Sequence, residues 1–250
     1  LSLICTTQAH TKNQMRPILL SSLTAVLLLS SPPLFAETGF RTFTNEAGKT
    51  LRAKPVLLGP NSVTLELENG RTIKSGLQFF IQADLDYLKK WDFRTKAQHG
   101  ELFDIDVNRV MDKVGKEKRE GYTLTFQEGY YKVKISNKTN RPLTGIRAEY
   151  RTFSLEESMG KKDSDDVKYN RDQGTFPIAI APFKTQKIET SKTSLQESKL
   201  DGGWAWAEGG DPNSSAKMAG IWLRFYLEDE SNTLLYEYAL PSSLTKREDW

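Results

Sequence analysis

The sequence predicts a mainly-β protein with a small barrel followed by an antiparallel β-sandwich. Short stretches in which apolar and polar residues alternate recur from residue 41 to residue 240, and this is the period of half-buried strands. Turn residues separate nearly all of these stretches. Long helical patterns are missing, and 38% hydrophobic with 27% charged residues is the composition of an ordinary globular protein. A chain of 250 residues is expected to form one or two domains.

A secretory signal peptide is predicted at residues 15–36. Met15-Arg16 provides a basic start, residues 18–29 are mostly apolar, and Ala36 precedes a polar chain; together these are the parts of a cleavable signal. We expect cleavage after Ala36, and we expect residues 1–14 to be a non-native upstream extension. The apolar run is short for a membrane span, which needs about 20 residues. A secreted or periplasmic protein with no stable span is therefore predicted, and a retained anchor is the alternative.

Charge and cysteine content narrow the possible partners and chemistry. Removal of residues 1–36 takes away Cys5, Lys12 and Arg16 and no acid, which leaves 33 basic and 32 acidic residues, a net charge of +1. The mature chain then has no disulfide framework, thiol catalysis or cysteine-based metal site. A near-neutral chain also lacks the clustered basic surface that nucleic-acid binding needs.

The barrel is predicted at residues 37–93. Arg41–Asn45 forms a first strand that ends at a Gly48 turn, and Leu51–Leu58 forms a second strand interrupted by Pro55. A turn at residues 59–62 leads into a hairpin. Four or five short strands and a terminal helix in about sixty residues are typical of a small barrel.

The hairpin register follows from the positions of its apolar residues. Asn69-Gly70 is a strong hairpin signal. A two-residue turn would place Glu66 opposite Ile73, which turns the one large apolar residue of the return strand to the wrong face. A three-residue loop at 68–70 places Leu65 opposite Ile73 instead. We therefore predict the longer loop, with Gly70 in the left-handed conformation.

A short helix closes the barrel. Leu85, Leu88 and Trp91 share one helical face. Asp84 lies early and Lys90 late, in agreement with the helix dipole. The polar residues that follow predict a linker at residues 94–100.

The order of residues in this region resembles the Sla-one homology domain one. That family is a small module of bacterial exported proteins and of a fungal endocytic adaptor, and the resemblance covers residues 39–91. Its pattern is matched by Arg41, Phe43, Asn45, Gly48, Ala53, Asn69, Gly70, Leu77, Phe80, Asp84 and Tyr87. Pro55, Gly76 and Ile81 depart from it. The resemblance implies an SH3-like barrel, and the fungal member binds Asn-Pro-Phe-x-Asp peptides.

A β-sandwich is predicted at residues 101–250. We expect eight or nine strands, with a loop at 116–120 and long polar loops at 155–175, 191–203 and 208–219. The expected strands include 103–107, 122–126, 131–135, 146–153, 178–180, 185–190, 204–207, 221–227 and 234–240. Repeated short strands without long helices indicate an antiparallel sandwich. The run 131–150 resembles immunoglobulin-like domains of exported bacterial proteins.

Two surfaces are candidate binding sites. On the barrel, polar and aromatic side chains frame a possible peptide groove: Phe43, Asn45, Arg71, Lys74, Phe79 and Asp84. The alternative reading of its aromatic residues is that they fill the barrel core. On the sandwich, Trp204, Trp206 and Trp222 are candidates for stacking on sugar rings, and the alternative is again a core position.

Catalytic and metal sites receive little support from the sequence. The acidic run 163–166 lacks the twelve-residue calcium-hand pattern, and we expect a solvated loop there. His99 is the only histidine of the mature chain, and no serine has a nucleophile-elbow context. We predict no metal and no cofactor.

The function predicted is non-catalytic. We expect a protein-binding or peptide-binding scaffold of the cell envelope that recognises a protein or peptide ligand through the SH3-like module. Carbohydrate or cell-wall binding is the alternative, and an unrecognised hydrolase is the second alternative.

Overall fold

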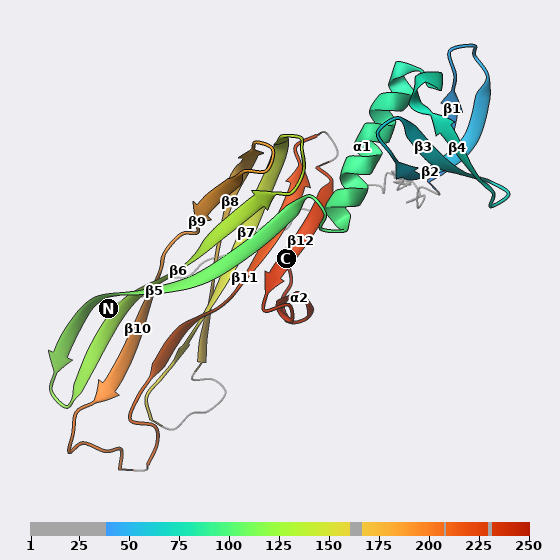
Figure 1. The fold of residues 1–250 in the computed structure, drawn as a ribbon. Helices are drawn as coiled ribbons and strands as arrows, with labels where there is room; N and C mark the ends of the chain where they lie inside the picture. The colour runs from blue at the N-terminus through green and yellow to red at the C-terminus, as the bar shows by residue number, and fades with distance from the viewer. Residues whose placement is uncertain (1–38, 161–166, 208, 230–231) are drawn as a thin grey trace, which may run out of the picture. The chain divides into compact units, whose positions relative to one another are not determined.

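The computed structural model describes residues 39–160, 167–207, 209–229 and 232–250. The signal peptide and the upstream extension predicted for residues 1–36 lie outside these residues, as does the acidic run 163–166. Figure 1 shows antiparallel sheets with one long helix, so the mainly-β prediction is confirmed. Within the described ranges, no helix is both long and apolar enough to cross a bilayer.

Four short strands form the first sheet as an antiparallel meander in the order β1-β2-β3-β4. Their bounds are β1 Arg41–Thr44, β2 Thr50–Leu58, β3 Ser62–Leu67 and β4 Thr72–Gly76. The hairpin register is the predicted one: Leu65 lies opposite Ile73, and the Leu67 amide donates to the Arg71 carbonyl at 2.8 Å. Gly70 has φ +78°, so the three-residue loop is confirmed. The β2–β3 register shifts after Pro55, where the strand interruption was predicted.

A short 3₁₀ turn, η1 (Leu77–Phe79), leads into helix α1 (Gln82–Gln98). Near the start of the helix, buried Asp84 accepts hydrogen bonds from Arg41 Nη2 at 2.5 Å and from the Thr44 amide at 2.6 Å. The Arg41 guanidinium also lies 3.9 Å from the centre of the Tyr87 ring. These contacts fasten the helix to β1, because a buried carboxylate is stable only when it is paired.

The predicted linker at residues 94–100 is wrong for most of its length, because α1 continues to Gln98. Residues 92–98 hold no helix breaker, and Lys96 Nζ pairs with Asp92 Oδ2 one turn earlier at 2.8 Å. Ala97 is fully buried in the core of the following sheets. Tertiary packing thus extends the helix into residues whose polar sequence predicted only a connector.

The remaining strands form two antiparallel four-stranded sheets. One sheet has the order β10-β6-β5, with β9 also paired to β6. The other has the order β12-β11-β7-β8. The bounds are β5 Phe103–Arg119, β6 Tyr122–Asn137, β7 Leu143–Glu157, β8 Val167–Ile180, β9 Thr185–Glu189, β10 Thr193–Leu200, β11 Ser215–Leu227 and β12 Leu234–Leu240. Buried side chains of both sheets form one core, so the predicted antiparallel sandwich is confirmed.

Several strands are longer than predicted. Residues 116–119 belong to β5 and not to a loop, β8 begins at Val167 inside the predicted loop 155–175, and β10 occupies most of the predicted loop 191–203. Conversely, the predicted strand 204–207 is irregular. Each missed strand is rich in polar residues, so the alternation of apolar and polar side chains did not reveal it.

The interior of the sandwich changes character along β7 and β8. We call the part that contains β9 and β12 the apolar half, and the part that contains β10 and residues 167–174 the polar half. In the apolar half the inward side chains are buried aliphatic or aromatic groups, among them Val133, Ile135, Leu143, Ile146, Ala148, Ile178, Ile180, Ile221, Leu223 and Phe225. In the polar half, β10 and β11 still supply Leu195 and Met218, whereas β7 and β8 supply hydroxyl, carboxylate and amide groups.

A second, smaller core covers the outer face of the β12-β11-β7-β8 sheet. It consists of Phe153, Trp222 and Leu244 of the short helix α2 (Leu244–Arg247). A Cβ at Gly220 would lie 2.4 Å from Leu244 Cδ1, so glycine is what allows α2 to approach the strand. Tyr150 and Phe153 face opposite sides of β7, as their spacing predicts.

Candidate functional site

The six residues predicted to bind a peptide on the meander do not form one surface. Phe43 is 1% exposed and Asp84 is 2% exposed, so both belong to the core. Phe43 packs edge-on against Phe80 and Tyr87, with ring centres 5.7 and 6.1 Å away. The predicted contact role of these two residues is therefore corrected to a structural one, which was the alternative reading of Phe43.

The other four predicted residues are more accessible. Asn45 accepts a hydrogen bond from the Lys49 amide at 2.7 Å and so shapes its own turn. Arg71 and Lys74 are exposed, and Phe79 is 58% exposed. Arg71, Lys74 and Phe79 are thus the predicted meander residues that remain available to a partner.

Of the three tryptophans predicted to bind carbohydrate, one is buried and two are exposed. Trp222 is 3% exposed in the core beneath α2, so it does not share an open surface with the other two. Trp204 is 58% exposed and Trp206 is 42% exposed, both in the loop between β10 and β11. Their rings lie beside glycine backbone: an ideal Cβ at Gly121 would be 3.2 Å from Trp204, and one at Gly160 would be 3.6 Å from Trp206.

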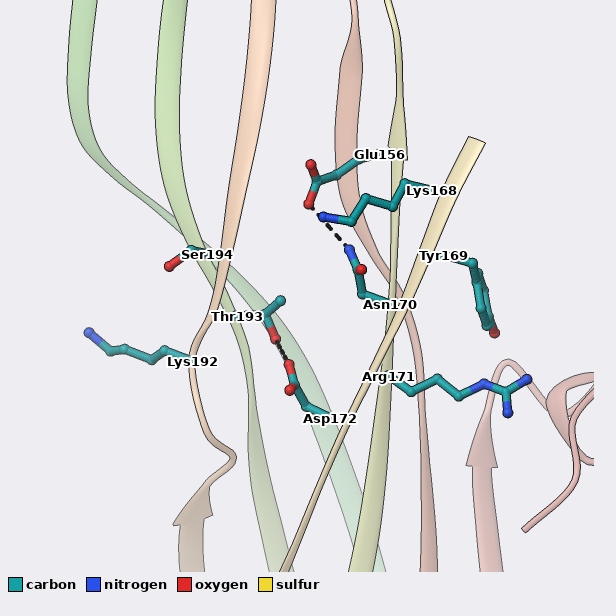
Figure 2. Close-up of a pocket in the computed structure, with 9 residues that line it drawn as sticks. All are labelled: Glu156, Lys168, Tyr169, Asn170, Arg171, Asp172, Lys192, Thr193 and Ser194. Atoms are coloured by element: carbon teal, nitrogen blue, oxygen red, sulfur yellow. Dashed lines mark hydrogen bonds between the residues drawn. The ribbon is translucent and has the colours of Figure 1, made fainter. Parts of the chain in front are cut away.

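An open cavity of about 730 Å³ lies in the polar half, between β8 and the start of β10. We call it the β8–β10 slot. Its lining residues are Glu156, Lys168, Tyr169, Asn170, Arg171, Asp172, Lys192, Thr193 and Ser194. Figure 2 shows Asp172 pointing toward Thr193, whereas Tyr169 and Arg171 point to the other side of the strand.

Hydrogen bonds order the polar lining of the slot. Thr193 Oγ1 donates to Asp172 Oδ2 at 2.6 Å and so joins the two sheets. Asn170 Nδ2 donates to Glu156 Oε1 at 3.3 Å between β8 and β7. Opposite Asn170 and Asp172 in the β7–β8 register lie Ser154 and Thr152. Their hydroxyls are buried and have no hydrogen-bond partner among the described residues, which is a costly arrangement for a closed core.

The edge of β8 is capped in one half of the sandwich and open in the other. β8 is the last strand of its sheet. In the apolar half, the Gln186 side chain acts like a neighbouring strand: its Oε1 accepts from the Ala179 amide at 3.1 Å, and its Nε2 donates to the Pro177 carbonyl at 2.9 Å. Along residues 167–174, the described part of the chain provides β7 on one side and no strand on the other. An unpaired edge offers a row of backbone donors and acceptors.

Charges around the slot have mixed sign. Lys168, Arg171 and Lys192 are basic, whereas Glu156 and Asp172 are acidic and already accept hydrogen bonds. Lys192 Nζ lies 2.6 Å from Glu128, and this contact raises the pKa of Lys192. Because Arg171 is likewise paired with Glu248, the site presents hydrogen-bonding groups and one further basic side chain, Lys168, without a deep apolar pocket.

The resolved pKa shifts provide no acid–base pair. They affect tyrosine, lysine and arginine side chains, and all are upward, away from neutral pH. Among the described residues, no three His, Cys, Asp or Glu side chains gather in an arrangement that could hold a metal ion. The slot itself is lined by polar groups that form hydrogen bonds with one another.

Sequence reasoning missed the slot because its strands are polar. The signal that could have found it is the alternation of Phe176, Ile178 and Ile180, which fixes the inward positions of β8. Continuing that alternation toward the N-terminus places Asp172 and Asn170 on the inward face.

No protein-family model and no curated protein matches this chain. Similarity to solved structures is slight. One is Northeast Structural Genomics Consortium target SoR45, with 12% identity and a TM-score of 0.26 over 54% of this chain and 84% of the other. Another is the putative ApaA protein from Bordetella pertussis, with 13% identity and a TM-score of 0.24 over 55% of this chain and 92% of the other.

Proposed function

We propose that this protein is a non-catalytic peptide-binding protein that takes an extended segment of a partner protein into the β8–β10 slot. The observation that carries the proposal is the open edge of β8 along residues 167–174, next to a cavity of about 730 Å³. A location in the cell envelope follows only if the signal peptide predicted at residues 15–36 is functional.

The edge favours an extended peptide over a compact ligand. A peptide that adds to a sheet edge satisfies its own amides and carbonyls with those of the edge strand, and side-chain pockets then determine specificity. Gln186 already supplies this type of bond to β8 in the apolar half. In the polar half, a partner backbone would supply it.

The basic side chains of the slot suggest what the partner carries. Of the three basic residues that line the cavity, Arg171 is paired with Glu248 and Lys192 with Glu128, whereas Lys168 lies on the slot side of β8 (Figure 2). An extended segment with an acidic side chain on the side that faces β8 would place it near Lys168.

The test begins with selection of binding peptides from a random displayed library with residues 37–250, followed by calorimetric measurement of their affinities. Lys168 is exposed on β8, and Figure 2 shows its side chain on the slot side of the strand, so Lys168→Trp narrows the cavity without disturbing the core. We expect this variant to bind selected peptides at least about tenfold more weakly, and Thr144→Trp, an exposed position of β7 outside the slot, to bind as wild type does.

Two further arms identify the binding mode and the site. Methylation of alternate peptide amides should abolish binding in one of the two alternating sets, because only one set would face β8. Equal binding by wild type and Lys168→Trp would refute the slot. Loss of binding in the double variant Arg71→Glu, Lys74→Glu would instead assign recognition to the SH3-like module predicted from the sequence.

Carbohydrate binding is the second candidate, and the half-exposed rings of Trp204 and Trp206 favour it. Each indole rests on glycine backbone, and Trp206 Nε1 donates to the Asp211 carbonyl at 3.3 Å, so the rings are held in place before a sugar arrives. Soluble cell-wall glycans should shift the tryptophan fluorescence of wild type but not of Trp204→Ala, Trp206→Ala. Unchanged wild-type emission at millimolar glycan would eliminate this candidate.

A further inference from the structure

Residues 248–250 lie against the outer face of the β12-β11-β7-β8 sheet and hold β8 from that side. The Glu248 carboxylate accepts from Arg171 Nη2 at 2.5 Å and from the Tyr169 hydroxyl at 2.8 Å. The Glu248 side chain is itself largely buried. Hydrogen bonds to a buried charged group are stronger than those between neutral partners.

The two residues that follow Glu248 continue this attachment onto β7 and β11. Arg151 Nη1 donates to the Asp249 carbonyl at 3.0 Å. Trp250 packs edge-on against Trp222 with ring centres 5.1 Å apart. The guanidinium groups of Arg151 and Arg224 lie 5.0 and 4.5 Å from the Trp250 ring centre, within the range of cation–π attraction.

These contacts bring the segment to the same strand that borders the slot. Tyr169 and Arg171 alternate along β8 with Asn170 and Asp172, so one face of the strand carries the Glu248 contacts and the other faces Thr193 (Figure 2). Burial, followed by the hydrogen bond to Glu248, raises the pKa of Tyr169. The strand is an edge strand, and an edge strand has backbone hydrogen bonds on one side only. Side-chain anchors therefore matter more for its order than for that of a central strand.

We infer that residues 248–250 act as a clasp that keeps the open edge of β8 ordered and thereby sets the affinity of the β8–β10 slot. The expected effect of the clasp on peptide affinity rests on the proposed function, whereas its expected effect on the order of β8 does not. A strand already held in place loses less conformational entropy when a partner strand pairs with it. The clasp thus contacts two residues that line the slot, Tyr169 and Arg171, from the outer face of the sheet.

The first test needs no ligand. Hydrogen exchange of the 167–174 amides is measured by mass spectrometry in wild type, Glu248→Ala and Tyr169→Phe. The matched control is Glu117→Ala, which removes another carboxylate that is paired with an arginine, Arg119, on β5 of the other sheet. We expect exchange in this stretch to be about tenfold faster in Glu248→Ala, less affected in Tyr169→Phe, and unchanged in Glu117→Ala. Unchanged exchange in Glu248→Ala would overturn the clasp.

The second test uses a peptide selected on wild-type protein. Affinity should fall about threefold to tenfold in Glu248→Ala and stay at the wild-type value in Glu117→Ala. Equal affinity together with faster exchange would overturn the coupling to the slot. Faster exchange with no peptide selected at all would retain the clasp as a determinant of β8 order and would count against the proposed function alone.

Discussion

The apolar and polar halves of the sandwich use the same two strands for different purposes. β7 and β8 stay paired from Leu143↔Ile180 to Glu157↔Val167, although their inward side chains change from aliphatic to polar along the way. In the apolar half the two sheets close on a buried apolar core, and Gln186 caps the edge. In the polar half no described strand pairs with the edge, and a cavity opens. Backbone pairing can therefore continue where side-chain packing does not.

The largest expected contrast concerns the loss of an inward side chain in the apolar half. Ile146 is fully buried, so Ile146→Ala should lower the free energy of unfolding by about 2–5 kcal/mol, measured by urea denaturation. The control Thr144→Ala, at an exposed position of the same strand, should change it by less than about 0.5 kcal/mol. A cost for Ile146→Ala as small as that of the control would mean that the apolar half is not the stabilising core.

A smaller effect is expected when the edge cap is removed. Gln186→Ala deletes both hydrogen bonds to β8 and should cost about 1 kcal/mol, with faster hydrogen exchange of the Ala179 amide. Lys187→Ala, its neighbour on β9, serves as the control. If the Ala179 amide stays equally protected in Gln186→Ala, the distinction between a capped and an open edge does not hold.

In the polar half, replacement of a buried hydroxyl by a methyl group should not lower the free energy of unfolding. The Thr152 hydroxyl is buried without a hydrogen-bond partner among the described residues, so Thr152→Val replaces a desolvated polar group with a methyl of similar size. We expect the free energy of unfolding to be unchanged or to rise by up to about 1 kcal/mol. A clear loss of stability would show that the hydroxyl makes a favourable interaction, for instance with water in the slot.

The last effect is absent at neutral pH, because it is confined to alkaline solution, and it arises at the boundary between the halves. Burial, opposed by the positive charge of Arg109, raises the pKa of Tyr131 from 10.0 to about 12. The folded state therefore holds the phenol proton more tightly than the unfolded state, and stability is complete below pH 10 and falls as the pH rises toward 12. Tyr131→Phe should lessen this decline. An identical alkaline decline in both proteins would assign it to other groups.

Much of the fold could be predicted because apolar residues determine it. Leu65 and Ile73 decided the register of the meander hairpin, and the alternation in 234–240 identified β12 with its observed bounds. In α1 the prediction ended too early, because the residues after Trp91 are polar and only tertiary packing of Ala97 shows why the helix continues.

The candidate sites could be predicted less well, because residue type does not reveal exposure. The Trp-x-Trp spacing of Trp204 and Trp206 suits a strand, but both rings rest on glycine backbone in an irregular loop. Trp222 has the same residue type and is buried. The slot was missed because its inward residues, such as Asp172, are ones that a sequence pattern assigns to loops.

The open edge of β8 also bears on how copies of the molecule behave toward one another at high concentration. An exposed edge is a template on which identical chains can stack into aggregates. Along Val167–Ile180 the first residues carry Lys168, Arg171 and Asp172 and include no run of neighbouring apolar side chains. Two such edges brought together in parallel would set like charges against each other. The polarity of this edge thus disfavours the stacking of identical chains.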